Sequence, residues 1–523
     1  MSDEFPSGGT VPKRVKDFTK GVPIKSLRDG EMLGGQIGKD KVLLVCRGED
    51  FFAVGSECTH YHGDLTQGLL VGDEVRCPLH HACFDLRTGE ALRAPAFDPI
   101  PCWRVERIED KVFVRGKIDF DKTNASDREQ KQSDNAAKNH PSSVVIIGGG
   151  ASGFSGAEML RRKGYSGHIT MVSADKTAPY DRPNLSKDYL SGDASDEWMP
   201  LRPRNFYKQH KIELMLNTRV ASIDAKKRSI TLEKGKTLEY GALLLATGAE
   251  PIKLALTGAT KSQVMYLRSY ADSKAIIQKA RAGKRVIILG ASFIALEVAA
   301  SLRTRKVNVH VVAPDHEPLE RVLGAQIGKF LRGLHESHGV VFHLGETITQ
   351  VKGRKAVLKS GKTLDVDFLV LGVGVKPSTK LAEDAGLMVD NGVLVNEYLE
   401  SSEPGIFAAG DIANWPDTYS GERLRIEHWV VAERQGQVAA KNMLGLRERY
   451  DLAPFFWTAQ FGVEIRYAGH AKKWSAVKID GSLKSKKCAV TFRRSGRTLA
   501  VATINRDLKS LEVEREMEIA SRT

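Results

Sequence analysis

Two Cys-His pairs near the start of the chain are the residues best suited to chemistry. Cys58 and His60 form the first pair, and Cys77 and His80 follow after sixteen intervening residues. Two such pairs on two loops can ligate two irons, and His in place of Cys raises the potential of a [2Fe–2S] centre. Zinc is an alternative for two Cys and two His, although zinc fingers usually pair Cys with Cys. A chance arrangement in the core is the least favoured reading, because these ligands cluster in a short, turn-rich segment.

A glycine-rich turn could hold a dinucleotide. The apolar residues Val144–Ile147 predict a buried strand, and Gly148, Gly150 and Gly153 follow it with the spacing Gly-x-Gly-x-x-Gly. Glycine lets the backbone approach a pyrophosphate, and the next helix directs free N–H groups at that anion. An acid about twenty residues further on is expected to bind ribose. Asp175 lies twenty-two residues past Gly153, after the strand predicted over His168–Val172.

A second strand-turn-helix unit over 285–295 departs from this pattern. Its three positions are Gly290, Ser292 and Ala295, of which the last two are small enough for a nucleotide to approach. Ala313 stands where an acid is expected after the next strand, and Asp315 is a possible substitute. We expect no arginine there to bind a 2′-phosphate. The sequence therefore predicts a nicotinamide site with a mild preference for NADH over NADPH.

The cysteines are unevenly placed. Five of the six lie in the first fifth of the chain, and none occurs between Cys102 and Cys488. A disulfide scaffold is not indicated, and clustered cysteines favour metal or redox work. Dithiol chemistry beside a bound flavin needs a cysteine pair. The cysteine-free middle excludes it, so electrons would have to leave by another path.

Composition places the chain among ordinary globular proteins, with 41% hydrophobic and 27% charged residues. No apolar run approaches a membrane span, and the polar first thirty residues show no secretory signal, so we expect a cytoplasmic protein. The net charge is +14, and residues 471–523 hold 13 Lys and Arg against 6 Asp and Glu. We interpret that basic region as a solvated surface, with docking of an acidic redox protein as the alternative. No nucleic-acid-binding module is recognised.

Pattern changes along the chain predict four domains and a linker. Short strands broken by turns predict an all-β domain over 20–118, and the polar stretch 119–141 reads as a flexible linker. Alternating strands and helices then predict two Rossmann-like α/β domains and, after them, a small α+β domain. These cover 142–260 with 382–445, 261–381, and 446–523.

The first domain resembles the Rieske [2Fe–2S] family, in which Cys-x-His and Cys-x-x-His loops hold the cluster. The resemblance implies that Cys58 and Cys77 ligate one iron and that His60 and His80 ligate the other. High-potential members carry an extra cysteine pair that bridges the loops. Gly63 and Leu79 stand at those positions here, which implies the lower-potential, ferredoxin-like branch.

Residues 142–445 resemble pyridine-nucleotide-dependent flavoproteins. The stretch Pro179–Lys187, Pro-Tyr-Asp-Arg-Pro-Asn-Leu-Ser-Lys, points to ferredoxin reductases and apoptosis-inducing-factor-like proteins, some of which carry an N-terminal Rieske domain. The resemblance implies FAD at the first loop, Asp175 on the adenosine ribose and Asp411 on the ribityl chain. The full set implied for FAD is Gly148, Gly150, Ala151, Ser152, Gly153, Asp175, Arg182, Lys187, Val220, Thr247, Gly248, Asp411, Glu427, His428 and Trp429. The set implied for NAD is Gly290, Ser292, Phe293, Ile294, Glu297 and Gly374.

Lys187 and Glu297 are the predicted catalytic pair, with Lys187 near flavin N5 and Glu297 beside it. A buried Lys stabilises the negative charge of reduced flavin, and a Glu partner keeps that Lys charged and oriented. The expected function is electron transfer from NAD(P)H through FAD and the cluster to an unidentified acceptor. The hypothesised linker would let the cluster move between flavin and partner. The alternatives are the reductase component of an oxygenase system and a redox-sensing, apoptosis-inducing-factor-like signalling protein.

Overall fold

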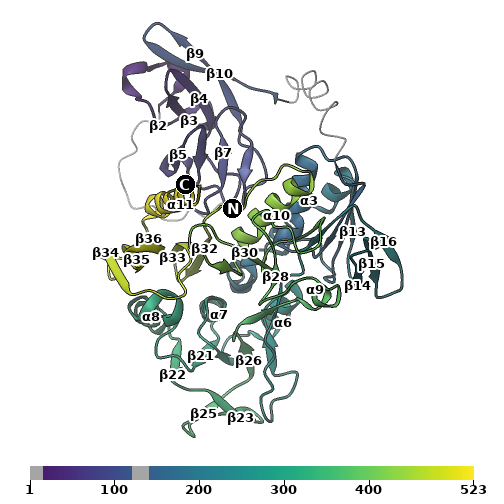
Figure 1. Ribbon diagram of the computed structural model, residues 1–523. Helices are drawn as coiled ribbons and strands as arrows, with labels where there is room; N and C mark the ends of the chain where they lie inside the picture. The colour runs from purple at the N-terminus through teal and green to yellow at the C-terminus, as the bar shows by residue number, and fades with distance from the viewer. Residues whose placement is uncertain (1–15, 121–139, 523) are drawn as a thin grey trace. The chain divides into compact units, whose positions relative to one another are not determined.

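The computed structural model describes residues 16–120 and 140–522, and it divides the chain into two compact units, 1–135 and 136–523. Each unit is described by itself (Figure 1). The predicted linker 119–141 falls mainly outside the described residues, and the domain boundaries given above stay predictions.

The first unit consists of two antiparallel sheets. Strand β3 (Asp40–Arg47) is buried on both faces, with Leu43 and Val45 in one apolar core and Val42 and Leu44 in another. Val75 and Phe84 of the smaller sheet pack in the first of these cores. The larger sheet has the order β1-β10-β9-β4-β3-β2, and the smaller has the order β5-β6-β7-β8. The strands are β1 (Val22–Pro23), β2 (Met32–Ile37), β3 (Asp40–Arg47), β4 (Asp50–Gly55), β5 (Leu69–Val71), β6 (Glu74–Arg76), β7 (Cys83–Asp85), β8 (Ala91–Arg93), β9 (Cys102–Ile108) and β10 (Lys111–Lys117). Three 3₁₀ turns are η1 (Phe18–Lys20), η2 (Ile24–Ser26) and η3 (Leu65–Gln67).

The second unit begins with a parallel sheet of order β13-β12-β11-β17-β29. Its strands are continuous apolar runs, as expected where helices cover both faces of a sheet. Helices α3 and α10 pack together beside it, as Figure 1 shows. Its elements are β11 (Ser143–Ile147), α3 (Ala151–Arg162), β12 (His168–Val172), η5 (Pro183–Ser186), α4 (Asp188–Ser191), η6 (Asp196–Trp198), α5 (Arg204–Gln209), β13 (Ile212–Met215), β17 (Ala242–Leu245), β29 (Ile406–Ala408) and α10 (Trp429–Met443). A three-stranded meander of β14 (Val220–Asp224), β15 (Ser229–Leu232) and β16 (Thr237–Glu239) joins β13 to β17.

A second parallel sheet of order β19-β26-β20-β21-β22 repeats this plan. Its elements are β19 (Val264–Tyr266), α6 (Tyr270–Lys279), β20 (Arg285–Leu289), α7 (Phe293–Thr304), β21 (Asn308–Ala313), α8 (Glu320–Ser337), β22 (Val341–Leu344) and β26 (Phe368–Leu371). It has its own meander of β23 (Ile348–Lys352), β24 (Lys355–Leu358) and β25 (Thr363–Asp365). The antiparallel pair β18 (Ala249–Pro251) and β27 (Val375–Pro377) carries the chain out of the first parallel sheet and back.

The chain then returns to the first parallel sheet through β29. The short elements around it are α9 (Lys380–Asp384), β28 (Val393–Leu394), β30 (Ala413–Pro416) and β31 (Arg423–Leu424). The last part is an antiparallel sheet of order β32-β33-β36-β35-β34, followed by α11 (Asp507–Arg522). Its strands are β32 (Phe455–Gln460), β33 (Val463–Gly469), β34 (Ala476–Ser482), β35 (Lys487–Arg494) and β36 (Arg497–Ile504). The predicted fold class is therefore confirmed: an all-β domain, two Rossmann-like sheets and an α+β end.

Candidate functional site

The first glycine loop has the backbone that a phosphate cradle requires. Gly148 has φ of 122°, and a Cβ there would lie 2.1 Å from the carbonyl oxygen of Ala246. A Cβ on Gly153 would lie 2.0 Å from the carbonyl oxygen of Gly148, so both positions exclude a side chain. Gly150 caps α3 without a side-chain hydrogen bond, and a Cβ there would have only the Arg182 guanidinium nearby, at 3.7 Å. The N-terminal N–H groups of α3 are thus accessible to an anion.

The second loop keeps the same turn with different residues. Gly290 has φ of 107°, and a Cβ there would lie 2.5 Å from the carbonyl oxygen of Gly372. Ser292 caps α7: its hydroxyl oxygen accepts from Ala295 N–H at 3.3 Å, and the hydroxyl donates to the Gly372 carbonyl at 3.1 Å. Ser292 therefore binds one of the free N–H groups at the start of α7, whereas no side chain does so at the start of α3.

Lys187 and Glu297 meet where the two nucleotide-binding folds join. Lys187 ends the Pro-Tyr-Asp-Arg-Pro stretch, and Glu297 lies on the buried face of α7. The Lys187 ammonium lies 2.9 Å from Glu297 Oε2, with the two side chains 14% and 5% exposed. Ser186 Oγ donates to the same oxygen at 2.5 Å. The Glu297 carboxylate thus accepts two short hydrogen bonds at one oxygen, which fix the position of the Lys187 ammonium.

A cluster of arginines beside the first loop suits an anionic ligand. Arg182 Nε is buried and finds no hydrogen-bond partner in the described part of the chain. Burial lowers the pKa of Arg182, and the neighbouring positive charge of Arg268 lowers it further. Arg268 Nη2 in turn donates to Asp411 Oδ2 at 2.8 Å. A buried, incompletely paired guanidinium next to a like charge fits the pyrophosphate of a dinucleotide.

Several of the other residues predicted to bind FAD have protein partners of their own. Asp175 accepts from Thr177 N–H at 3.0 Å and from the Tyr180 hydroxyl at 2.8 Å, so its carboxylate is held beside the end of β12. Thr247 Oγ1 donates to the Ser378 carbonyl at 3.1 Å, and the backbone of Gly248 lies against Arg268. Val220 starts β14, and Ala151 and Ser152 open α3.

Glu427, His428 and Trp429 precede and begin α10. The Arg425 guanidinium lies 2.7 Å from Glu427 Oε1, and burial raises the pKa of Glu427 despite that positive neighbour. His428 packs on Phe456, with ring centroids 4.3 Å apart, and burial lowers its pKa to about 3. This segment therefore brings a neutral imidazole to the junction with β32.

The predicted NAD residues lie around the start of α7. Phe293 packs on Phe456 with ring centroids 4.7 Å apart, while Ile294 is 44% exposed. Gly374 has φ of 105° and follows β26. The expectation of no arginine at the ribose position stays a prediction. Arg321 Nε lies 2.9 Å from Asp315 Oδ1, because the loop after β21 folds back to the first turn of α8.

The two Cys-His loops of the first unit have matching backbones. Cys58 N–H donates to Gly63 O at 2.9 Å, and Cys77 N–H donates to Ala82 O at 2.8 Å, each closing a loop of the same length. The Nδ1 atoms of His60 and His80 lie 3.1 Å apart. The Cys58 thiol contacts Cys77, and that contact together with burial raises the pKa of Cys58 strongly. Two nitrogens and two sulfurs grouped as separate pairs fit the donor set of a Rieske cluster.

The position of Gly63 agrees with the absence of a bridge between these loops. A Cβ on Gly63 would lie 2.8 Å from Cys77 Sγ and 2.9 Å from the Leu79 side chain. Gly63 and Leu79 are thus neighbours, as the family pattern implied, and neither carries sulfur.

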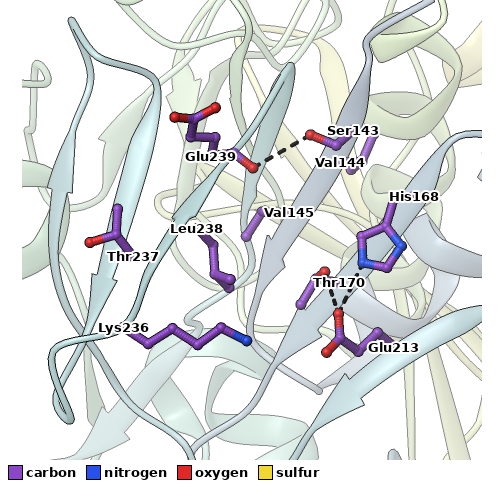
Figure 2. Close-up of a pocket in the computed structure, with 10 residues that line it drawn as sticks. All are labelled: Ser143, Val144, Val145, His168, Thr170, Glu213, Lys236, Thr237, Leu238 and Glu239. Atoms are coloured by element: carbon purple, nitrogen blue, oxygen red, sulfur yellow. Dashed lines mark hydrogen bonds and ion pairs between the residues drawn. The ribbon is translucent and has the colours of Figure 1, made fainter.

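A separate pocket of about 520 Å³ lies beside the start of β11, at the end of that strand away from the first glycine loop (Figure 2). Figure 2 shows Glu213 on the neighbouring strand, below His168 and Thr170 and bonded to both; its Oε2 lies 2.9 Å from His168 Nε2 and 3.0 Å from Thr170 Oγ1. None of the predicted site residues lines it, since the nucleotide loop follows the other end of the strand.

Sequence reasoning missed several residues of the site. Ser186 stands inside the recognised Pro-Tyr-Asp-Arg-Pro stretch and could have been noticed beside Lys187. Arg268 and Thr458 lie far from any recognised motif, and Thr458 Oγ1 donates to Glu297 Oε1 at 2.6 Å. No signal in the sequence marks these two, because only the fold brings them to Asp411 and Glu297.

Three family descriptions match the chain. "Pyridine nucleotide-disulphide oxidoreductase" matches residues 142–436, "Rieske [2Fe-2S] domain" matches 18–104, and "Reductase C-terminal" matches 455–521. The chain therefore belongs to the pyridine nucleotide-disulphide oxidoreductase family and carries an added Rieske domain.

Individual relatives agree with this assignment. The chain is 34% identical to "Apoptosis-inducing factor 3" of Homo sapiens over 92% of this chain and 81% of the relative. It is 34% identical to "Rhodocoxin reductase" of Rhodococcus erythropolis over 70% of this chain and 86% of the relative. A solved structure of a covalent putidaredoxin reductase–putidaredoxin complex is similar, with a TM-score of 0.70 and 30% identity over 72% of this chain and 93% of that chain.

The protein is thus an NAD(P)H-dependent flavoprotein oxidoreductase of the ferredoxin reductase type, with FAD and a Rieske [2Fe–2S] cluster as its cofactors. Helices long and apolar enough to cross a bilayer are absent from residues 16–120 and 140–522. The expected cytoplasmic location stays a prediction.

Proposed function

We propose that this protein carries electrons from NAD(P)H through FAD to its own Rieske cluster and on to an external redox protein. FAD supplies the conversion of a hydride, a two-electron carrier, into single electrons, and a [2Fe–2S] cluster carries one electron at a time. The observation that carries the proposal is the buried Lys187–Glu297 pair, which joins the segment after the first glycine loop to the helix after the second.

Lys187 and Glu297 are proposed as the catalytic pair. The ammonium of Lys187 supplies a fixed positive charge where negative charge develops on reduction, and such preorganised charges act strongly in a water-poor site. Glu297 holds that ammonium in place at 2.9 Å. The Glu297 side chain is buried and the Lys187 side chain is only 14% exposed, so the pair is weakly screened by solvent.

The nucleotides are assigned to the two loops. We propose that the N-terminal N–H groups of α3, with Arg182, hold the FAD pyrophosphate, while Asp175 and Asp411 bind its ribose and ribityl hydroxyls. The start of α7 would bind the nicotinamide nucleotide, with Asp315 at its ribose. The ion pair of Asp315 with Arg321 weakens the case for a strict NADH preference, because a guanidinium there also suits a 2′-phosphate.

Cys58 and Cys77 are proposed as ligands of one iron, and His60 and His80 as ligands of the other. The closely matched loops and the pairing of thiol with thiol and imidazole with imidazole support this assignment. The acceptor is proposed to be a small, acidic redox protein, which the basic region 471–523 would attract by its charge.

An anaerobic titration with NADH and with NADPH tests the whole scheme. The purified protein is followed by absorbance and by low-temperature EPR. Flavin bleaching followed by a reduced Rieske signal is the expected result. Iron-free protein that contains zinc would contradict the cluster ligands, and bleached flavin with an oxidised cluster would contradict the electron path.

A redox-sensing role is the second candidate. The similarity to Apoptosis-inducing factor 3 covers 92% of this chain, whereas that to Rhodocoxin reductase covers 70%. A sensor would turn over slowly and form a long-lived charge-transfer complex with the nicotinamide. Rapid reduction of ferredoxin or cytochrome c would favour the reductase instead.

A further inference from the structure

Glu297 stands at the end of a buried row of hydrogen bonds that reaches three parts of the second unit. Thr458 Oγ1 donates to Glu297 Oε1 at 2.6 Å, and Gln460 Nε2 donates to Thr458 Oγ1 at 3.1 Å. His335 Nε2 lies 2.8 Å from Gln460 Oε1. Thr458 and Gln460 lie on β32, and His335 lies on α8. Their side chains are buried: Thr458 is 1% exposed, Gln460 3% and His335 0%.

The chemistry of these groups fixes the direction of each hydrogen bond. An amide oxygen only accepts, so the N–H of His335 is on Nε2 and donates to Gln460. Burial lowers the pKa of His335 to about 4, which leaves the ring neutral with that single proton. The Gln460 amide then donates to the oxygen of Thr458. A hydroxyl has one proton, and with its oxygen engaged by Gln460 that proton is directed at Glu297.

Glu297 therefore receives donors from two sides. Lys187 and Ser186 donate to Oε2, and Thr458 donates to Oε1. Without Thr458, Oε1 would be a buried carboxylate oxygen short of a donor, which is unfavourable and would let the carboxyl group rotate away from Lys187. That rotation weakens the hold on the Lys187 ammonium.

We propose that Thr458, oriented by Gln460 and His335, is a positioning residue for the hydride-transfer step: it keeps the Glu297 carboxylate aligned on Lys187. The inference rests on the proposed function of the Lys187–Glu297 pair. It gives the C-terminal part of the chain a role in the flavin reaction, because β32 supplies both Thr458 and Gln460.

The test uses full-length protein with FAD and the cluster bound. Thr458→Val removes the hydroxyl with little change of shape, Thr458→Ser keeps it, and Thr503→Val is the matched control. Thr503 is also fully buried on β36, and its hydroxyl has no hydrogen-bond partner in the described chain, so nothing is lost there. Flavin reduction by NADH is followed by stopped flow, and the flavin midpoint potential by dye equilibration.

Thr458→Val should slow flavin reduction about tenfold, the scale of one hydrogen bond to a charged group, with the apparent Kd for NADH within about twofold of wild type. The flavin midpoint potential should fall, because the reduced form loses stabilisation. Thr458→Ser should recover most of the rate, and Thr503→Val should match the wild type in both measurements.

Equal rates and potentials in Thr458→Val and Thr503→Val would overturn the inference while leaving the proposed function intact. Wild-type protein that fails to reduce its flavin with NADH would instead overturn the proposed function. If Thr458→Val loses FAD, Gln460→Met removes the donor that orients Thr458, together with the acceptor of the His335 N–H, and should still slow reduction about threefold. Loss of FAD from both variants but not from Thr503→Val would show a purely structural role and would also overturn the inference.

Discussion

The two nucleotide loops follow the same turn and differ in what they leave for a ligand. In both, a glycine with positive φ lies so close to the backbone carbonyl that follows a neighbouring strand that a Cβ would clash with it. At the second position, Gly150 leaves the terminus of α3 uncapped by a side chain, whereas Ser292 caps α7 with its own hydroxyl. A terminus with free N–H groups suits a cofactor that stays bound, and a partly satisfied one suits a nucleotide that must leave after each turnover.

At the third motif position the two loops carry different residues but keep the same backbone turn. A Cβ at Gly153 would meet the Gly148 carbonyl at 2.0 Å, but Ala295 occupies the matching position of the second loop. In the second loop Gly372 lies opposite that methyl group, and a Cβ on Gly372 would lie 3.0 Å from Ala295 Cβ. In the first sheet Ala246 stands at the position of Gly372. The first loop therefore has glycine at the third motif position and alanine after the neighbouring strand, whereas the second loop has alanine and then glycine.

The largest effect should come from placing the second loop's residue in the first. Gly153→Ala forces a methyl group against backbone and should weaken FAD binding about ten- to hundredfold, the range of an overpacked core substitution of about 1–3 kcal/mol. FAD content after dialysis and thermal unfolding measure it. The matched change Ala295→Gly should leave FAD content as in wild type, and a fully loaded Gly153→Ala protein would contradict the steric argument.

A smaller effect should follow from filling the space that Gly372 leaves. Gly372→Ala should raise the Kd for NADH about tenfold, because a contact of 3.0 Å between two methyl carbons pushes α7 away from the loop. Adding Ala295→Gly should restore binding, and the double-mutant cycle measures that coupling. Independent effects of the two substitutions would show that the methyl groups do not compete.

Ser292→Gly should make the second loop more like the first. Removing the cap exposes the N–H of Ala295 to the nucleotide, so we expect the Kd for NAD⁺ to fall about threefold, while the loss of helix stability is only a few tenths of a kcal/mol. Isothermal titration with NAD⁺ and thermal unfolding separate the two. Weaker NAD⁺ binding would mean that the Ser292 hydroxyl itself holds the nucleotide.

The two parallel sheets should also differ in how their stability changes at acid pH. Burial lowers the pKa of His343 to about 4, and His310 beside it is lowered as well. The unfolded imidazoles take up protons from about pH 6.5 downward, while the folded ones stay neutral, so the free energy of unfolding falls between pH 6.5 and 4. In the first sheet the hydrogen bond from His168 lowers the pKa of Glu213, and its contribution is lost only at lower pH.

Hydrogen exchange followed by mass spectrometry at pH 7 and pH 5 measures this difference. Strands β21 and β22 should lose protection before β11 and β12. His343→Gln keeps a hydrogen-bonding side chain without the titration and should reduce the pH dependence. Equal loss of protection in both sheets would contradict the assignment.

Much of the site could be predicted from sequence because its residues act through local backbone. The Cys-His loops close within five residues, and the glycine turns are set by strands and helices directly beside them. Asp175 and Asp411 follow strands whose apolar runs are visible in the sequence. The ion pair of Arg321 with Asp315, six residues away, could not be predicted, because only the fold of the loop after β21 joins them.

The sequence by itself determined the two nucleotide loops, the two Cys-His pairs, the Lys187–Glu297 pair and the lack of a redox dithiol in the middle of the chain. Tertiary structure decided what holds those groups. Thr458 reaches Glu297 across 161 residues, Arg268 reaches Asp411 across 143, and Gly372 makes room for Ala295 from another strand. The physical reason is that hydrogen bonds and packing depend on distance in space, whereas a motif records only distance along the chain.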